Sequence, residues 1–207
     1  MQELRRRKNQ ELVVTSRQEE ILIGSLLGDA YITVRGQIQF EQSVHQKEYL
    51  FWKHQELNSI SYKNVSMAKR FDKRYQKENI SYRFWTRQYF ISWRNKFYVK
   101  NKKIVPKDIK LTPLSLAVWY MDDGCFSDNK CIIATDGFSK DDIYFLQEFL
   151  LEEFNIKSSL KNKSKIMIKK ESFNAFFPII RPYIISSMLY KIFDPVTTSV
   201  KSRDGFL

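Results

Sequence analysis

Residues 22–30 read LIGSLLGDA, and about 94 residues later residues 116–124 read LAVWYMDDG. Each stretch is an apolar run that closes on an acid and a small residue, Asp29-Ala30 in the first and Asp123-Gly124 in the second. A pattern that returns at a fixed spacing indicates a fold built from similar units. We therefore expect two related halves, each organised around one of these stretches.

Both stretches carry signals for the start of a helix. Ser16-Arg17-Gln18-Glu19 precedes the first and reads as a capping box, and Thr112-Pro113 precedes the second as an N-cap followed by proline. We expect two apolar helices whose last turn presents Asp29 or Asp123. The partial negative charge at a helix C-terminus disfavours an acid there by up to about 1 kcal/mol. Two such acids suggest a positive group nearby, although one motif alone would read as a buried helix ending in a surface acid.

The pattern after each helix also repeats. Each half is expected to continue with a hairpin, an amphipathic helix, a second strand pair and an aromatic-rich helical stretch. In the first half these lie at residues 31–34 with 37–42, 45–58, 65–71 with 80–88, and 90–101. In the second half they lie at residues 126–135, 140–154, 157–161 with 165–169, and 173–190. The chain is thus expected to be α+β, with halves at residues 16–110 and 111–195, a basic N-terminal tail at 1–15 and a C-terminal tail at 196–207.

Each half also closes on a short sequence that begins with lysine. The first is Lys103-Ile104-Val105-Pro106 and the second is Lys191-Ile192-Phe193-Asp194-Pro195. The two lysines follow Asp29 and Asp123 at similar distances along the chain. Neighbouring carboxylates suit Mg²⁺, which takes one or two carboxylates plus substrate phosphates and keeps several waters. Such a site could activate water for phosphodiester hydrolysis, with a lysine neutralising the developing charge.

The strands carry side chains that suit a DNA groove. In the first hairpin the core-facing residues are expected to be Ile32, Val34, Ile38 and Phe40. The opposite face would present groups that pair with base edges, since Gln pairs with adenine, Arg with guanine and Glu with cytosine. The candidate DNA-binding residues are Arg35, Gln37, Gln39, Glu41, Arg83 and Arg87, with Lys161 and Lys163 in the second half. For any one of them, a solvated sheet face is an equally good interpretation.

The charge of the chain points to a polyanionic partner. There are 35 basic and 23 acidic residues, which gives a net charge of +12. No run of 18 apolar residues could span a membrane, and the charged N-terminus does not resemble a secretory signal. The two cysteines, Cys125 and Cys131, are too few for a disulfide framework and are expected to be reduced and buried.

Composition also bears on the compartment. The chain is rich in residues with A/T-rich codons and has only 6 glycines and 5 prolines. An AT-rich gene is typical of organelles and of some bacteria. We therefore expect a protein of a mitochondrion or chloroplast if the host is eukaryotic, and a cytoplasmic protein otherwise; in neither case is it expected to be secreted.

The two stretches resemble the paired motifs of single-chain LAGLIDADG homing endonucleases. Gly24 and Asp29 match the first motif, and Leu116-Ala117 and Asp123-Gly124 match the ends of the second. The resemblance covers most of the chain. It departs at Ala30, where the family usually has glycine, and at Val118, where a small residue is expected, and neither change touches the acids.

The resemblance implies a fold and a set of roles. In that family two αββαββα halves pack through their motif helices, and saddle-shaped antiparallel sheets face the DNA. It implies that Asp29 and Asp123 bind the catalytic Mg²⁺ or Mn²⁺, with Gly28 and Asp122 beside them, and that Lys103 and Lys191 are the basic catalytic residues. It further implies a monomer that cuts both strands of a long asymmetric duplex and leaves a staggered break.

Two other functions fit parts of the same pattern. An intron maturase of this fold would bind intron RNA, and a DNA-binding protein without catalysis would keep only the basic surface. Neither needs two acids and two lysines in matched positions, so the sequence favours the nuclease.

Overall fold

The computed structural model describes residues 12–192. Most of the predicted N-terminal tail, the Phe193-Asp194-Pro195 segment and the predicted C-terminal tail lie outside the described residues. Among the described residues no helix has the length and apolar character needed to cross a bilayer. The chain divides into two compact units between Lys96 and Phe97. The two predicted halves, which meet at residues 110 and 111, and the packing of their motif helices stay predictions.

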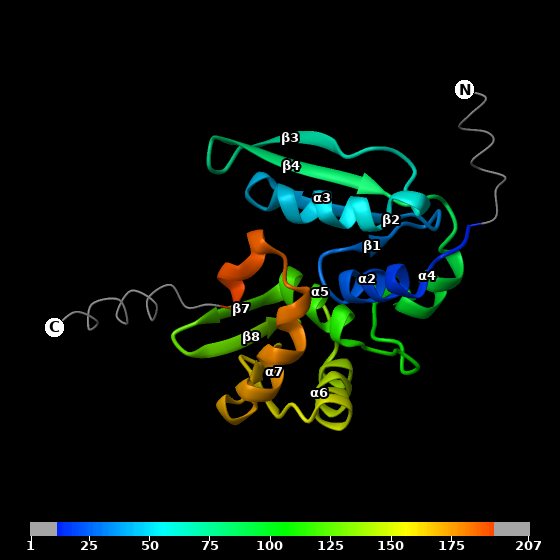
Figure 1. The fold of residues 1–207 in the computed structure, drawn as a ribbon. Coiled ribbons are helices and arrows are strands. Elements are labelled where there is room, and N and C mark those ends of the chain that lie inside the picture. The colour runs from blue at the N-terminus through cyan, green and yellow to red at the C-terminus, as the bar shows by residue number, and fades with distance from the viewer. Residues whose placement is uncertain (1–11, 193–207) are drawn as a thin grey trace. The chain divides into compact units, whose positions relative to one another are not determined.

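The first unit consists of helices packed on one antiparallel sheet. Its helices are α2 (Ser16–Leu27), α3 (Lys47–Glu56) and α4 (Ile91–Phe97), which ends at the division between the units. Its strands are β1 (Tyr31–Ile32), β2 (Ile38–Ser43), β3 (Ser66–Asp72) and β4 (Lys77–Trp85), with short 3-10 turns at η1 (Val44–Gln46) and η2 (Asn58–Ile60). All neighbouring strands are antiparallel, in the order β1-β2-β4-β3, and α3 runs along this sheet (Figure 1).

The second unit begins with a small hairpin and then repeats the plan of the first. The hairpin consists of β5 (Tyr98–Val99) and β6 (Lys102–Lys103). The helices are α5 (Pro113–Asp123), α6 (Lys140–Phe154) and α7 (Phe173–Ile180), followed by η4 (Arg181–Tyr183) and η5 (Ser186–Lys191), with η3 (Lys170–Ser172) before α7. The strands are β7 (Gly124–Ser127), β8 (Lys130–Ala134), β9 (Ser158–Lys161) and β10 (Lys165–Ile168), in the order β7-β8-β10-β9.

The two sheets have the same topology. From α2 in the first unit and from α5 in the second, the elements run in the order helix, two strands, helix, two strands, helix. This confirms the α+β class and the αββαββα order that the sequence predicted. The β7–β8 hairpin turns at Asp128 and Asn129, whose φ angles of 51° and 56° are those of a two-residue turn that matches strand twist.

The two motif helices begin and end differently from one another. Thr15, and not Ser16, caps α2, and its side chain and that of Gln18 form the reciprocal capping box. The helix ends at Leu27, so the prediction that its last turn presents Asp29 is wrong: at Gly28 the backbone leaves the helical region, with a ψ of −132°. In α5 the predicted Thr112 cap is confirmed and Asp123 is the last helical residue.

The core of the first unit lies between α3 and one face of the sheet, where the helix packs on β2 and β4. Phe40 and Phe84 stack at 4.6 Å on the neighbouring strands β2 and β4, while Ile32 and Ile38 are fully buried. Val34 was predicted to join them but is 76% exposed. The reason is that β1 stops at Ile32, so Val34 lies in the turn that precedes Gly36.

Gly36 explains why this turn is tight. Its φ is +73°, a conformation that favours glycine. Its carbonyl accepts the N–H groups of Tyr89 and Phe90, and an added Cβ would come within 2.6 Å of an Ile91 side-chain carbon. The turn of the first hairpin is therefore fixed against the start of α4.

The core of the second unit is built around α5, whose residues from Leu116 to Met121 are fully buried. The Tyr120 hydroxyl donates to the carbonyl of Lys191 at 2.9 Å and lies 3.6 Å from the Cys131 sulfur. Burial raises the pKa of the Tyr120 hydroxyl far above its ordinary value. Burial also raises the pKa of the Cys131 thiol to about 12, against a smaller opposing effect of the bond to Tyr120. Cys131 is thus buried as predicted, but Cys125 is exposed, because it points to the opposite face of the sheet.

Both predicted closing helices are shorter than expected. The first ends at Phe97, and Lys100 and Asn101, with φ angles of 48° and 63°, turn the chain into the β5–β6 hairpin. The second ends at Ile180 and continues as 3-10 turns, because Pro182 has no N–H to extend the α-helical pattern.

Candidate active site and nucleic-acid interface

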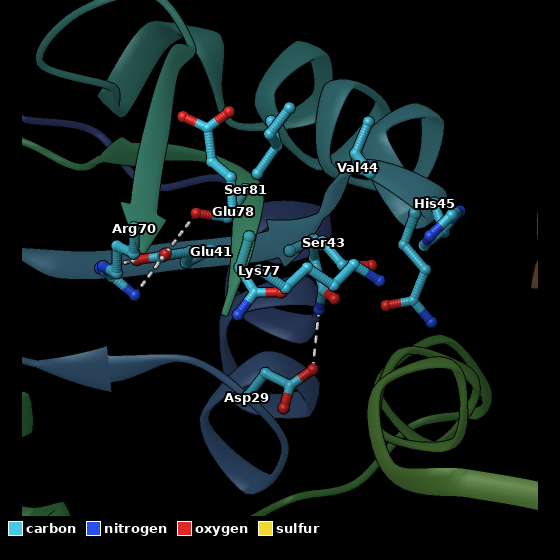
Figure 2. Close-up of a pocket in the computed structure, with 13 residues that line it drawn as sticks. Asp29, Glu41, Ser43, Val44, His45, Arg70, Lys77, Glu78 and Ser81 are labelled. Carbon is cyan, nitrogen blue, oxygen red and sulfur yellow. Dashed lines mark hydrogen bonds and ion pairs between the residues drawn. The ribbon is translucent and has the colours of Figure 1, made fainter. Parts of the chain in front are cut away.

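Asp29 lies on the loop between α2 and β1, where its exposed carboxylate is held by one neighbour. Gln42 of β2 donates from Nε2 to Oδ2 of Asp29 at 2.7 Å (Figure 2). Gln42 is only 6% exposed, since it alternates with the outward-facing residues of the strand. A buried amide therefore fixes the orientation of the first motif acid.

Asp29 also lines a pocket of about 470 Å³ within the first unit (Figure 2). The pocket is bordered by β2 and η1 on one side and by β3 and β4 on the other. Its lining residues are Asp29, Glu41, Gln42, Ser43, Val44, His45, Gln46, Arg70, Lys77, Glu78, Asn79, Ile80 and Ser81. The acid at the end of the motif and the polar side chains of the sheet thus share one polar hollow. It is lined by the carboxylates of Asp29, Glu41 and Glu78 and by two cations, Arg70 of β3 and Lys77 of β4.

Asp123 ends α5 in different surroundings. It is half-buried, and its neighbour Asp122 is 8% exposed. Nζ of Lys191, the last residue of η5, donates to the carbonyl oxygen of Asp122 at 2.8 Å. A cation at the C-terminus of a helix offsets the partial negative charge there. The structure therefore brings the predicted lysine Lys191 to the end of the second motif helix.

The other predicted lysine, Lys103, lies on β6 opposite Tyr98. It is half-buried, and its ammonium lies 5.9 Å from the centre of the Phe138 ring. Phe138 belongs to the loop that leads into α6. The two lysines that the sequence matched by position therefore have unlike surroundings, one on a helix end and one over an aromatic ring.

The outward face of the first sheet is a connected polar surface. The Gln39 amide oxygen accepts from Tyr31 Oη at 2.6 Å and from Trp85 Nε1 at 2.9 Å. Glu41 accepts from Ser81 Oγ at 2.6 Å and forms an ion pair with Arg70 at 2.9 Å. These side chains come from all four strands, so the surface is held in one arrangement by its own bonds.

Arg83 lies in the middle of this surface. It pairs in register with Glu41 on one side and with Ser66 on the other, and its guanidinium lies 5.0 Å from the centre of the Trp85 ring. Gln39, Glu41 and Arg83, three of the predicted DNA-binding residues, are therefore brought together on one sheet face.

Three other predicted DNA-binding residues of this unit lie outside the strands. Arg35 is exposed in the turn of the first hairpin. Gln37 precedes β2 and donates from Nε2 to the carbonyl oxygen of Thr86 at 3.3 Å. Arg87 follows β4, where its backbone N–H donates to Ile60. They flank the strands that carry the polar surface.

In the second unit, Lys161 ends β9 and Lys163 is exposed in the following turn. Lys161 pairs in register with Lys165 of β10, which pairs in turn with Ala134 of β8. This row faces away from the buried side chains of Cys131, Ile133, Ile166 and Ile168.

Sequence reasoning missed two residues that the structure places in the site. Gln42 was expected only as a strand end, yet it contacts Asp29; strand alternation alone would have put it in the core beside Phe40. Arg70 was expected only as part of a strand, and its ion pair with Glu41 joins positions that lie far apart in sequence. Only the antiparallel register of β2, β4 and β3 reveals that contact.

The donor groups of the motif acids suit a hard divalent cation. Asp29 and Asp123 offer carboxylate oxygens, the ligands that Mg²⁺ and Mn²⁺ accept along with water and phosphate. Within residues 12–192 no cluster of three or more His, Cys, Asp or Glu side chains could hold a metal by itself. Each carboxylate, taken by itself, could therefore supply only part of the ligands of such an ion.

Comparison with known proteins identifies the family. The model described as the LAGLIDADG DNA endonuclease family matches residues 19–176. The structure is similar to that of the homing endonuclease I-WcaI bound to its DNA recognition sequence, with a TM-score of 0.83, 28% identity and 92% of each chain covered. The chain belongs to the LAGLIDADG DNA endonuclease family.

Two relatives illustrate the range of this family. A probable intron-encoded endonuclease of Wickerhamomyces canadensis is 30% identical over 89% of this chain and 87% of its own length. A cytochrome b mRNA maturase of Saccharomyces cerevisiae is 32% identical over 83% of this chain. The match to the yeast maturase covers only 46% of that protein, so this chain spans about half the length of that relative.

Proposed function

We propose that this chain is a homing endonuclease that hydrolyses both strands of a long asymmetric DNA target and leaves a staggered break. The observation that carries the proposal is the pocket of the first unit, where Asp29 lies with Glu41, Arg70 and Ser81 of the polar sheet face. It puts a motif acid beside groups suited to base edges and phosphates. Membership of the LAGLIDADG DNA endonuclease family supports the same activity.

Divalent metal belongs to this proposal. Asp29 and Asp123 would hold Mg²⁺ or Mn²⁺, with the backbone at Gly28 and the carboxylate of Asp122 beside them. When bound, the ions supply Lewis-acid activation of water and of the scissile phosphate. Gln42 contributes by fixing the Asp29 carboxylate through its bond to Oδ2.

The two lysines have distinct proposed roles. Lys103 would place a positive charge near the phosphate and stabilise the charge that develops on its oxygens. Lys191 holds the Asp122 carbonyl, so its contribution combines charge with the positioning of the end of α5. Gln39, Glu41 and Arg83 would contact base edges, while Arg35, Gln37, Arg87, Lys161 and Lys163 would contact the flanking groove and phosphates.

The partner and the compartment follow from the same reading. One chain carries two related units, so one chain would bind one duplex as a monomer. A mitochondrial or chloroplast location fits the AT-rich composition and the relatives whose names describe intron-encoded and cytochrome b mRNA functions.

A maturase is the second candidate function, because the yeast relative is named as a maturase of cytochrome b mRNA. Such a protein would bind intron RNA and need no motif acid. A DNA-binding protein without catalysis would likewise tolerate loss of the acids. Loss of the motif acids therefore distinguishes the nuclease, which needs them, from both alternatives, which do not.

The test is a pair of substitutions, Asp29→Asn and Asp123→Asn. Each keeps the shape of the side chain but removes the charge that a divalent ion needs. We expect both variants to keep their fold and DNA binding and to lose double-strand cleavage of a plasmid that carries the insertion site of the gene. Cleavage with and without Mg²⁺, thermal melting and gel shift are measured together. Normal cutting of both strands by either variant would refute the active-site assignment.

A further inference from the structure

The outward faces of the two sheets have the same topology but opposite chemistry. In the first sheet, register aligns Tyr31 with Gln39 and Gln39 with Trp85, a row of hydrogen-bonding groups. In the second sheet, register aligns Cys125 with Ile132, Ile132 with Met167, and Met167 with Ser159. The central strands of the second sheet thus present an aliphatic side chain and a thioether where the first presents an amide and an indole N–H.

The apolar row of Ile132 and Met167 is partly exposed. Ile132 and Met167 are half-buried, whereas the residues next to them on the same strands, Cys131, Ile133 and Ile168, are fully or almost fully buried. Strand alternation therefore directs Ile132 and Met167 to the face that lies away from the core of their unit. Ala134 lies two residues further along β8, opposite Lys165, and adds a small apolar side chain to the same face.

Lysines surround this row. Lys165 and Lys161 extend the Ala134 row across β10 and β9, Lys130 lies at the start of β8, and Lys163 is exposed in the β9–β10 turn. No acid occurs among the strand residues of this outward face. An apolar centre within a positively charged border complements a polyanion that carries apolar groups.

Duplex DNA offers both features in its major groove. Its border is phosphate, and its floor carries one exposed apolar group, the C5 methyl of thymine, which apolar side chains recognise by direct contact. We propose that the second sheet recognises its half of the target mainly through thymine methyl groups, with Ile132 and Met167 as the specificity-determining residues and Lys161 and Lys165 holding the phosphates. The first sheet recognises the other half by hydrogen bonds. This inference rests on the proposed function.

Deoxyuridine provides a direct test, because it lacks only the C5 methyl of thymidine and keeps the same base pairing. A duplex bound by the full-length chain is first selected from a randomised library without divalent metal. Each thymidine of the selected target is then replaced singly by deoxyuridine, and affinity is measured by gel shift. Burial of one methyl group corresponds to about a fourfold change in affinity. We expect losses of about this size for a group of thymidines on one side of the target centre, and little change on the other side.

Variants assign the effect to its residues. In Ile132→Ala and Met167→Ala the penalty for particular deoxyuridines should disappear, because the contact that senses the methyl is already gone. Met167→Gln keeps the length of the side chain and should lose the same penalties. It serves as a second variant in case Met167→Ala does not fold, and thermal melting checks the fold of each variant. Ser159→Ala on the same row and Gln39→Ala in the first sheet are the matched controls, and both should leave the deoxyuridine penalties unchanged.

The outcomes separate the two proposals. If the chain binds and cuts its duplex but deoxyuridine costs nothing on either side, or the penalties persist in all three Ile132 and Met167 variants, the thymine inference is overturned and the endonuclease stands. If the chain selects no duplex at all, the endonuclease proposal and this inference are both overturned.

Discussion

At the scale of single residues, the contact between Gln42 and Asp29 is the least expected feature of the site. An acid that binds a metal must present its oxygens in a defined direction, and an exposed aspartate on a loop has several rotamers of similar energy. The 2.7 Å bond from a buried amide removes that freedom. A hydrogen bond to a charged group stabilises by about 1.5–3 kcal/mol, enough to hold one orientation.

Gln42→Ala should therefore raise the concentration of Mg²⁺ needed for half-maximal cleavage while leaving DNA affinity in the absence of metal nearly unchanged. The loss of one charge-assisted bond predicts roughly a tenfold change or more. Metal titrations of cleavage, run beside gel shifts, measure both quantities. Gln39→Ala on the same strand is the control, since its amide serves the outward face, and it should weaken binding without moving the metal requirement. An unchanged metal titration for Gln42→Ala would show that the contact has no part in catalysis.

The two lysines provide a second residue-scale prediction, because their contacts differ. Lys191→Ala removes a cation from the end of α5 and leaves the Asp122 carbonyl without this donor, so it should lower the free energy of unfolding by about 1 kcal/mol as well as slow cleavage. Lys103→Ala should slow cleavage with little change in stability.

Urea unfolding and single-turnover cleavage separate these effects. Lys191→Arg, which keeps the charge and a donor, should recover most of the stability. Equal stability of the Lys191→Ala variant and the wild type would mean that the bond to Asp122 contributes nothing to the fold.

The places of side chains in the fold were predictable from the sequence only where a motif or strand alternation fixed them, and their roles in cleavage and DNA binding stay predictions. Asp29, Asp123 and Lys191 stand out because the pattern is written twice, and Gln39, Glu41 and Arg83 because strands alternate. Gln42 and Arg70 were not, since their contacts depend on how a loop returns to a strand and on cross-strand register. Val34 was misplaced for a similar reason: alternation was extended past the point where β1 ends.

At the scale of elements, residue patterns and capping signals predicted most helices and strands, and the errors occur where turns compete with helix formation. The aromatic-rich stretch after Phe90 has a helical pattern, but Lys100 and Asn101 adopt positive φ and form a hairpin instead. The first motif helix stops before its acid because the backbone of Gly28 leaves the helical region. Such local backbone preferences are worth about 1 kcal/mol or less, too little to be read with certainty from sequence.

The packing of β8 against α5 makes the free energy of unfolding depend on pH in the alkaline range. The pKa of the Cys131 thiol is raised to about 12 in the folded protein from an ordinary 9.0. Well below pH 9.0 the thiol is protonated in both the folded and the unfolded chain, so the full stability is present. Between that value and about 12 the unfolded chain loses the proton while the folded chain keeps it, so stability falls by up to about 1.4 kcal/mol per pH unit.

Denaturant unfolding at several values between about pH 8 and pH 10.5 tests this linkage. Cys131→Ala should flatten the decline in the free energy of unfolding, whatever its effect at neutral pH. Cys125→Ala is the matched control, because its thiol is exposed and should leave the slope unchanged. The same slope in both variants would contradict the burial argument; residual decline above pH 10.0 is expected from Tyr120.

At the scale of the whole molecule, the net charge of +12 should dominate association with DNA. Each phosphate contact releases counterions, so a plot of log affinity against log salt should have a slope several units negative. Sedimentation of the complex should at the same time give one chain per duplex. A flat salt plot would remove the nucleic-acid partner, and a stable complex of two chains would contradict a monomeric enzyme.

The doubled sheet also has a consequence for how such a protein changes over generations. In a symmetric dimer every substitution appears twice, so both halves of a palindromic site must change together. Here the β1-β2-β4-β3 sheet and the β7-β8-β10-β9 sheet share a topology but not a sequence. A mutation in one sheet leaves the other untouched, so a lineage of the proposed endonuclease could follow drift in its DNA target one half at a time.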